Sequence, residues 1–267
     1  MLTAEEPTFS EPDFLEFASR IKAKFGLDLL SYKQPQVRRR LNSLRIRKGY
    51  DTFTEFFRRI DASPQVQKEF IDQLTINVTE FYRNPERWQV LSEHIVPELL
   101  SQTQTLKCWS AACSTGEEPY TLAMAMSAHL PLRRLDILAT DLDATVIRTA
   151  KTGVYSAEAV KVVPPDMCTR HLSVDDDGRY KVSEDIKQRV RFQEHNLLFD
   201  PPDSGFDLIV CRNVLIYFTP VAKNQLIARF SQALRPGGYL FVGGTEQITN
   251  AASVGLESPY TFFYRKR

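Results

Sequence analysis

Residues 106–126 constrain the fold of this chain more than any other segment. A short apolar run is followed by a turn of small residues that ends in Gly116, and an apolar helical pattern then begins with Glu117, Glu118 and Pro119. This order predicts a buried strand, a tight turn and a helix whose first turn tolerates the proline. Small side chains in such a turn allow the backbone to approach a ligand closely, as in nucleotide-binding turns.

The two glutamates indicate which class of ligand the turn can hold. A helix N-terminus attracts anions because its free N–H groups and its dipole carry partial positive charge. Glu117 and Glu118 already supply negative charge there, so a pyrophosphate would be repelled. S-adenosylmethionine fits better, since it joins an ammonium and a sulfonium to an uncharged nucleoside. The alternative is that both acids only cap the helix.

A second strand is predicted over residues 134–141, and two acids follow it. Asp141 lies at the carboxyl end of this strand, where nucleoside-binding α/β folds place an acid that accepts hydrogen bonds from ribose hydroxyls. Asp143 is better explained as the N-cap of the next helix.

Two later strands also end in polar residues. The alternating run 190–198 places Asn196 near its end, where an amide could pair with an adenine edge. The apolar run 206–211 predicts a buried parallel strand that leads to Asn213 and Tyr217. Because ligands bind beyond the carboxyl ends of such strands, both residues are candidates for the reacting centre. The alternative for Tyr217 is a loop aromatic packed against the sheet.

The C-terminal segment predicts an antiparallel ending to an otherwise parallel sheet. Strands are expected over residues 239–243 and 260–264, with no intervening helix long enough for a parallel crossover. This architecture is that of the Rossmann-like methyltransferases.

The N-terminal part of the chain predicts a small helical domain. Apolar residues recur at helical spacing, with breaks near Gly26, Gly49 and Pro64. Its second helix has a cluster of one charge sign with no acid between its members. Such a cluster is either a solvated face or a surface that steers an acidic partner. Its arginines are Arg38, Arg39, Arg40, Arg45 and Arg47.

Residues 75–85 interleave polar side chains with aromatics before Pro85 restarts a helix. Asn77, Thr79 and Arg83 could converge on one pocket if this segment lies across the mouth of the α/β domain. The alternative is a linker between domains whose aromatics fill the joint.

Composition excludes several classes of protein. No apolar run approaches the roughly 20 residues of a membrane-spanning helix, and the N-terminus is acidic where a signal peptide is basic and then apolar. We therefore expect a cytoplasmic protein without membrane insertion. The net charge of +1 gives no reason to expect nucleic acid. The cysteines and histidines lack metal-ligand spacing, so we expect no metal and reduced thiols; His195 is a weak candidate for the site.

Four blocks of sequence, in order, closely resemble the CheR-type chemoreceptor glutamate methyltransferases. They are Asn-Val-Thr-Glu-Phe-Tyr-Arg at 77–83, Ser-Ala-Ala-Cys-Ser-Thr-Gly-Glu-Glu-Pro-Tyr at 110–120, Ala-Thr-Asp-Leu-Asp at 139–143 and Cys-Arg-Asn-Val-Leu-Ile-Tyr-Phe at 211–218. The resemblance implies an N-terminal helical domain over 1–84 and a Rossmann-like α/β domain over 85–267, with a small inserted β-subdomain over 155–190.

The resemblance also implies roles for individual residues. Arg83 and Tyr217 correspond to the proposed catalytic pair. The cofactor contacts correspond to Asn77, Thr79, Arg83, Glu118, Asp141, Asn196, Leu197, Arg212 and Asn213, and we add Gly116 and Glu117 from the turn.

The implied reaction moves a methyl group from S-adenosylmethionine to glutamate side chains on the cytoplasmic helical bundle of chemoreceptors, and S-adenosylhomocysteine is the second product. The arginines of the second helix are the expected substrate-binding surface, and we expect a monomer. Some family members tether a receptor pentapeptide through a glycine-containing loop; here the turn 175–178 lacks a second glycine, which argues against tethering.

Two rival functions stay open at this stage. One is methylation of RNA or of a small molecule, although the N-terminal domain lacks a recognisable RNA-binding motif. The other is a binding module that senses the cofactor without turning it over.

Overall fold

The computed structural model describes residues 10–75 and 77–267. Two compact units divide the chain. The first contains the described residues before 76 together with 217–224, and the second contains 77–216 and 225–267. The division falls at 76/77, earlier than the domain boundary expected after Asn84.

The first unit is helical, as the spacing of its apolar residues predicted. Phe14 and Phe17 of the first helix meet Phe53, Phe56 and Phe70 in one aromatic cluster, with ring centroids between 5.0 and 6.3 Å apart. Each buried phenylalanine contributes about 2–3 kcal/mol of apolar burial. Its elements are α1 (Glu11–Phe25), η1 (Leu29–Ser31), α2 (Gln34–Arg47), α3 (Phe53–Ala62) and α4 (Pro64–Leu74).

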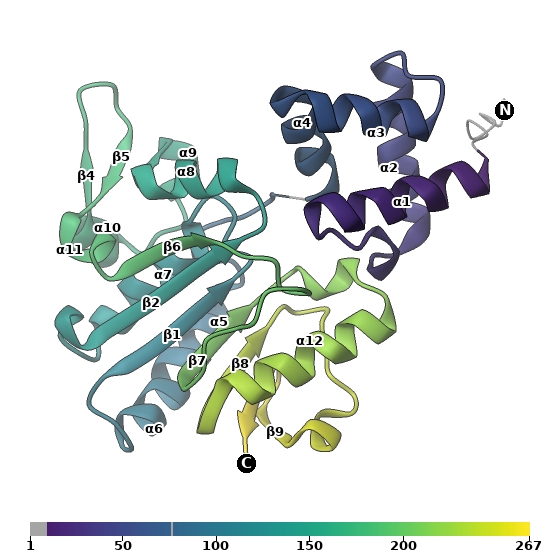
Figure 1. The fold of residues 1–267 in the computed structure, drawn as a ribbon. Helices are drawn as coiled ribbons and strands as arrows, with labels where there is room; N and C mark the ends of the chain where they lie inside the picture. The colour runs from purple at the N-terminus through teal and green to yellow at the C-terminus, as the bar shows by residue number, and fades with distance from the viewer. Residues whose placement is uncertain (1–9, 76) are drawn as a thin grey trace, which may run out of the picture. The chain divides into compact units, whose positions relative to one another are not determined.

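The second unit begins with helices and then alternates strands with helices (Figure 1). Two elements span the unit boundary: η4 (Leu215–Tyr217) and α12 (Pro220–Ala233). The others are α5 (Pro85–Val90), η2 (Leu91–Ile95), α6 (Val96–Leu100), β1 (Leu106–Ala111), α7 (Glu117–Ser127), η3 (Leu132–Arg134), β2 (Leu135–Asp141), α8 (Ala144–Thr152), β3 (Val154–Tyr155), α9 (Ala157–Val160), α10 (Pro165–His171), β4 (Leu172–Val174), β5 (Tyr180–Val182), α11 (Glu184–Lys187), β6 (Val190–Glu194), β7 (Phe206–Cys211), β8 (Leu234–Val242), η5 (Ala251–Val254), β9 (Leu256–Tyr260) and β10 (Phe263–Lys266).

The main sheet has seven strands in the order β6-β2-β1-β7-β8-β10-β9. The first five are parallel, whereas β10 is antiparallel to both β8 and β9. The expected fold class, a Rossmann-like sheet with an antiparallel C-terminal hairpin, is confirmed. A parallel sheet places the carboxyl ends of β6, β2, β1, β7 and β8 along one edge, where ligands bind in such folds.

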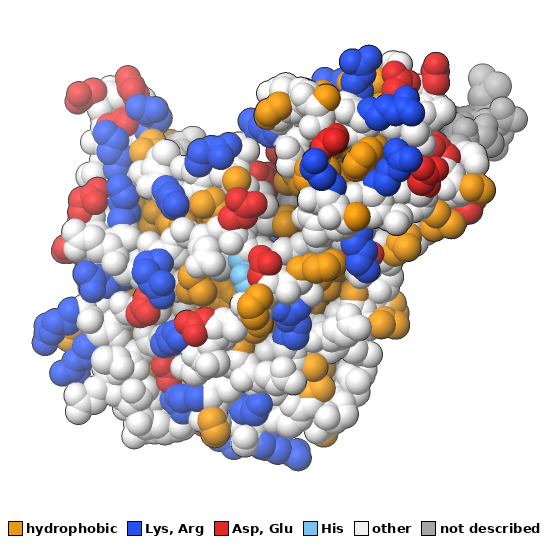
Figure 2. Space-filling view, in the orientation of Figure 1, with side chains coloured by type: hydrophobic (Ala, Val, Ile, Leu, Met, Phe, Trp, Pro, Cys, Tyr) orange, Lys and Arg blue, Asp and Glu red, His pale blue; other side chains and the backbone are white. Residues whose placement is uncertain are grey.

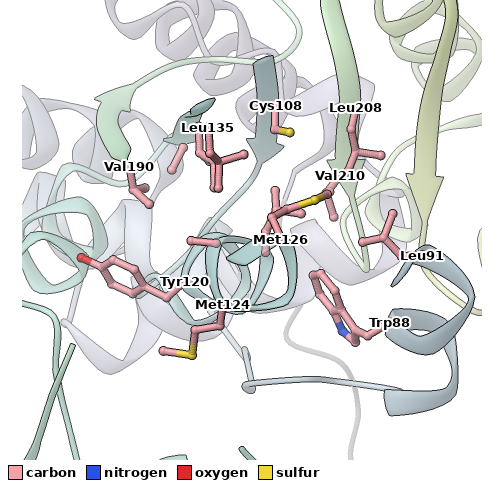
Figure 3. Packing of buried hydrophobic residues seen from close by; sticks show 14 of the residues in the cluster. Trp88, Leu91, Cys108, Tyr120, Met124, Met126, Leu135, Val190, Leu208 and Val210 are labelled. Atoms are coloured by element: carbon pink, nitrogen blue, oxygen red, sulfur yellow. The ribbon is translucent and has the colours of Figure 1, made fainter. Parts of the chain in front are cut away.

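Both faces of the central strands are buried. On one face, Cys108, Leu208 and Val210 join Met124 and Met126 of α7 in a single apolar cluster (Figure 3). Such strands read as continuous apolar runs because helices cover both sides of the sheet.

The opposite face packs against α12. The Trp109 ring lies 5.5 Å from that of Phe206 and 5.4 Å from that of Phe230 in α12. The sheet is therefore the middle of three layers, which holds its polar carboxyl-end loops in fixed positions.

The expected inserted subdomain is present as a three-stranded antiparallel sheet in the order β3-β5-β4. Its β4–β5 hairpin turns at Asp175–Gly178, where Gly178 has a φ of 75° and Asp175 accepts hydrogen bonds from the backbone of Asp177 and Arg179.

Three strand predictions were wrong in their boundaries. β8 spans Leu234–Val242, so it begins before the expected start at residue 239. β6 ends at Glu194, so Asn196 lies in the turn after the strand. The run 260–264 is not one strand, because a turn at Phe262 with a φ of 70° separates β9 from β10. The sequence-based prediction missed β9 because its alternation is weak and Pro259 lies within it.

Acidic and basic side chains alternate over the face of the molecule in Figure 2, in keeping with the net charge of +1. Among the described residues, no helix is both long and apolar enough to cross a membrane.

Candidate cofactor and catalytic site

The turn between β1 and α7 has a backbone that few sequences can adopt. Ala112, Ser114 and Gly116 all have positive φ, at 69°, 47° and 99°. A Cβ at Gly116 would lie 2.8 Å from the hydroxyl of Tyr155 and 2.9 Å from the Cβ of Ala150. Glycine is therefore required here both by conformation and by space. The turn keeps its small residues close to the carboxyl end of β1.

Asp141 ties the end of β2 to this turn. One carboxylate oxygen accepts the Ser114 N–H at 2.8 Å, and the other accepts the Asp143 N–H at 3.1 Å. Burial raises the pKa of Asp141, and these backbone hydrogen bonds oppose the rise. The carboxylate is thus held in one orientation and keeps lone pairs for a further donor such as a ribose hydroxyl.

Asp143 caps α8, as predicted, by accepting the Thr145 N–H at 2.7 Å. Its second carboxylate oxygen accepts from the Asn77 side-chain amide at 3.2 Å. Asn77 thereby joins the segment before α5 to the end of β2. No local sequence pattern predicts this pairing, since the two residues are far apart along the chain.

Glu117 and Glu118 have different surroundings. Glu117 is buried and accepts a hydrogen bond of 2.7 Å from the Thr115 hydroxyl, so its carboxylate is held within the turn. Glu118 is partly exposed and accepts a hydrogen bond of 2.8 Å from the hydroxyl of Ser110 at the end of β1. Glu118 is therefore the more accessible of the two carboxylates.

Desolvation raises the pKa of Glu118 to about 7. Arg212, the Ser110 hydrogen bond and Arg83 oppose this rise, whereas the charge of Glu246 adds to it. A desolvated carboxylate near neutrality gains strongly from a cationic partner. Glu118 is thus the natural partner of an ammonium group.

The segment that carries Arg83 is fixed through its backbone. Trp88 donates from its indole nitrogen to the Arg83 carbonyl at 3.1 Å, and Arg212 donates to the same carbonyl at 2.7 Å. Arg212 also donates to the Asn84 side-chain oxygen at 2.8 Å. Tyr82 and Asn84 both have positive φ, so these bonds stabilise a strained turn.

The side chain of Arg83 is partly buried and donates to the Val78 carbonyl at 3.3 Å. Its charge opposes the rise in the pKa of Glu118. Thr79, also predicted to be a cofactor contact, is partly buried in the same segment.

Arg212 lies deeper than a typical surface arginine. Its guanidinium is buried and lies 4.8 Å from the ring centroid of Phe241 and 5.6 Å from that of Trp88. Burial lowers its pKa, and Glu118 opposes the change. Arg212 thus supports the Arg83 segment as well as adding positive charge near Glu118.

Asn196 and Leu197 lie in the turn after β6 and are partly buried. The Asn196 side-chain oxygen accepts the Leu198 N–H at 3.0 Å, and its backbone N–H donates to Asp200 at 2.7 Å. Neighbouring His195 is buried and burial lowers its pKa, so it is neutral at pH 7.

Five buried polar atoms in these segments have no hydrogen-bond partner: Tyr82 Oη, Ser114 Oγ, His195 Nε2, Arg212 Nε and Asn213 Oδ1. Buried polar atoms normally find partners, so such a group marks a place where a polar ligand completes the bonding. Acidic Glu118 and Asp141 suit the ammonium and ribose of S-adenosylmethionine, and the donors suit its carboxylate. The residues present fit this cofactor.

Tyr217 belongs to the first unit. Its carbonyl accepts the Lys33 N–H at 2.8 Å, and the adjoining Phe218 pairs with Tyr32, with ring centroids 4.8 Å apart. Burial lowers the pKa of Arg40, and Tyr217 opposes this change.

The five arginines of α2 do not form one surface. Arg45 is buried and donates to the Tyr50 carbonyl at 2.7 Å, while Arg38 donates to Glu11 at 2.7 Å and lies over the Phe14 ring. These two support the helical unit itself. Arg39 and Arg47 are exposed, and Arg40 is partly buried.

No cluster of three or more His, Cys, Asp or Glu that could hold a metal ion occurs in residues 10–75 and 77–267. All four cysteines are free thiols, and burial raises the pKa of Cys108, Cys113 and Cys211. Raised thiol pKa values disfavour the reactive thiolate.

Comparison with known proteins shows the family to which this chain belongs. Residues 77–259 match the model of the CheR methyltransferase SAM-binding domain, and residues 12–75 match that of the CheR all-alpha domain. The chain is 43% identical to the chemotaxis protein methyltransferases of Listeria innocua and Listeria monocytogenes, over 96% of this chain and 98% of each relative. A third, from Borreliella burgdorferi, is 33% identical over 89% of both chains. The chain therefore belongs to the CheR family of S-adenosylmethionine-dependent chemotaxis protein methyltransferases.

Proposed function

We propose that this enzyme esterifies glutamate side chains on the cytoplasmic helical bundle of chemoreceptors, forming γ-glutamyl methyl esters. Family membership carries this proposal, and the partly exposed Glu118 at the carboxyl ends of the strands supports it. The enzyme is proposed to work in the cytoplasm as a monomer.

The chemistry needs little from the protein beyond placement. A glutamate carboxylate with a pKa near 4.3 is ionised at pH 7, so no strong general base is required. When bound, S-adenosylmethionine supplies an electrophilic methyl group, and a neutral thioether leaves as the carboxylate oxygen takes that methyl. Alignment of the reacting groups can be worth about 7–11 kcal/mol at the extreme.

Two residues are assigned to the substrate carboxylate. Arg83 holds it by a charge-assisted hydrogen bond, and Tyr217 donates to its other oxygen. Each hydrogen bond to the attacking oxygen also lowers its nucleophilicity, so both residues act by orientation. Rigid support of the Arg83 backbone by Trp88 and Arg212 favours such a role.

The cofactor is assigned to the loops of the second unit. Glu118 pairs with its ammonium, Asp141 accepts from its ribose, and Asn196 with Leu197 contacts its adenine. The other assigned contacts are Asn77, Thr79, Arg83, Gly116, Glu117, Arg212 and Asn213.

The receptor is assigned to α2. Its exposed side chains Arg39 and Arg47, with the partly buried Arg40, would attract an acidic helical bundle, and this attraction weakens as salt is added. Arg38 and Arg45 contribute indirectly, through the packing of the unit.

Radiolabelled cofactor and a receptor cytoplasmic fragment test the reaction. The expected result is label on the fragment that mild base releases as volatile methanol, because carboxyl methyl esters are base-labile. Label that resists base would indicate methylation of nitrogen or of another stable site, and an absence of transfer would favour a cofactor-sensing module.

A further inference from the structure

Glu246 is a buried carboxylate that none of the sequence motifs includes. Its side chain is 1% exposed and lies just after the carboxyl end of β8. One oxygen, Oε2, accepts the backbone N–H of Asn213 and of Gly243, each at 2.7 Å, and Oε1 accepts the Ile216 N–H at 3.2 Å. Both oxygens therefore act as acceptors from the main chain.

We propose that Glu246 is a positioning residue, which sets the backbone of the loop after β7 from Asn213 to Ile216. This loop begins with a residue assigned to the cofactor and leads directly into Tyr217. The inference rests on the proposed roles of these two residues, and it adds the group that fixes the loop between them.

The loop needs such support because its start is strained. Asn213 has a φ of 60°, a conformation that costs a residue with a Cβ roughly 1 kcal/mol or more. The Glu246–Asn213 hydrogen bond holds this conformation against relaxation. The hydrogen bond from the Ile216 N–H fixes the other end of the loop. One side chain therefore holds the loop at two points, and we call this pair of contacts the Glu246 clamp.

The clamp requires a carboxylate. A glutamine side chain has only one acceptor oxygen. This oxygen is best placed where Oε2 lies now, because it then still accepts the hydrogen bonds from the Asn213 and Gly243 N–H groups. The glutamine NH₂ group would then face the Ile216 N–H, donor against donor. Glu246→Gln should therefore release the Ile216 end of the loop and retain the Asn213 end.

Gly243 gives a second, independent way to disturb the clamp. Its φ is not positive, but a Cβ there would lie 2.4 Å from Glu246 Oε2 and 2.9 Å from the Asn213 nitrogen. Gly243→Ala must therefore displace the carboxylate while leaving its charge in place.

The test measures backbone amide exchange and kinetics in the full-length enzyme. In Glu246→Gln we expect the Ile216 amide to exchange at least about tenfold faster, with Asn213 and Gly243 still protected. The kcat for receptor methylation should fall about tenfold or more, because small misplacements of catalytic groups are costly. The Kd for S-adenosylmethionine should stay within about threefold, since the Asn213 end is kept.

Glu98→Gln is the matched control. Glu98 is a partly buried carboxylate with two partners, the Tyr239 hydroxyl at 2.6 Å and Arg265 at 2.7 Å, both of which lie outside the loop. The Glu98→Gln variant should have a lower melting temperature than the wild type and an unchanged kcat.

Wild-type kcat in both Glu246→Gln and Gly243→Ala, or equal protection of the Ile216 amide in Glu246→Gln and wild type, would overturn the inference. If Glu246→Gln folds poorly, Gly243→Ala carries the kinetic test. Amide exchange is read without substrate, so failure of the receptor methylation assay in the wild type would count against the proposed function and leave this inference testable.

Discussion

The Asp141 carboxylate accepts a hydrogen bond of 2.8 Å from the Ser114 backbone N–H, which joins the end of β2 to the strained turn after β1. Both carboxylate oxygens accept from the main chain, the second from Asp143. The same side chain therefore shapes the turn and presents its remaining lone pairs to a ribose.

Asp141→Asn should weaken cofactor binding. The new NH₂ group would oppose either the Ser114 or the Asp143 N–H, and the charge that strengthens a ribose hydrogen bond would be lost. Hydrogen bonds to charged groups contribute about 1.5–3 kcal/mol, which corresponds to roughly 10- to 150-fold in Kd. Calorimetric titration with S-adenosylmethionine checks this, and an unchanged Kd would remove Asp141 from the cofactor site.

Cofactor affinity should depend on pH through Glu118. The pKa of its carboxyl is about 7, so the negative form that pairs with an ammonium is lost as pH falls below that value. The Kd should rise toward tenfold per pH unit below 7 and level off above it. Glu118→Gln should bind more weakly at pH 8 and show a flatter profile between pH 8 and 6. A wild-type profile as flat as that of the variant would contradict the assignment.

The Glu118 carboxyl should also make the stability of the folded protein depend on pH, but stability should fall as pH rises, whereas cofactor affinity should increase. Because the folded-state pKa of Glu118 lies above its ordinary value of 4.5, its stabilising contribution is complete below 4.5 and is lost as pH rises through about 7. Glu118→Gln should therefore raise the melting temperature of the cofactor-free protein at pH 8. The upper limit of the gain in the free energy of unfolding is about 3 kcal/mol. Water that reaches this partly exposed side chain makes the gain smaller. Thermal denaturation at pH 5 and pH 8 measures it; a gain that is no larger at pH 8 would count against the raised pKa.

Much of this site was predicted from sequence, because its signals are local. The turn 112–116, the cap at Asp143 and the polar residues after β2 and β7 each follow from the order of side chains within one strand and its loop. The antiparallel ending was also predicted, since the chain there is too short for a crossover.

The remaining features depend on contacts between distant segments. Glu246 carries no local signal of its three backbone partners, and nothing near Arg212 indicates that it holds the Arg83 carbonyl. The arginine cluster of α2 was predicted as one surface because sequence gives charge but not burial. Arg45 is buried against the carbonyls of Tyr50 and Asp51, which no pattern of charges reveals.

Tyr217→Phe should lower turnover far more than cofactor affinity. The phenol oxygen is assigned to the substrate carboxylate, so its loss removes orientation in the reaction without removing a cofactor contact. A fall in kcat of about 10²-fold is expected if one well-aligned hydrogen bond is lost. Single-turnover rates and the Kd for the cofactor separate the two effects, and an unchanged rate would take Tyr217 out of the mechanism.

Receptor methylation should depend on the exposed arginines of α2. Arg39→Gln with Arg47→Gln should lower kcat/KM for a receptor fragment severalfold at low salt, and the difference should shrink above about 0.3 M salt, because the Debye length shortens and screening strengthens. The matched control is Arg133→Gln with Arg134→Gln, two exposed arginines on η3 of the second unit. Equal effects of the two pairs would indicate dependence on net charge rather than on this helix.

Methyl ester formation on glutamate is measured by mass spectrometry of a receptor cytoplasmic fragment. After incubation with enzyme and S-adenosylmethionine, we expect peptides heavier by one methylene, with the added mass on glutamate side chains and removed by mild alkali. Added mass on lysine, arginine or histidine, or mass that survives alkali, would contradict it.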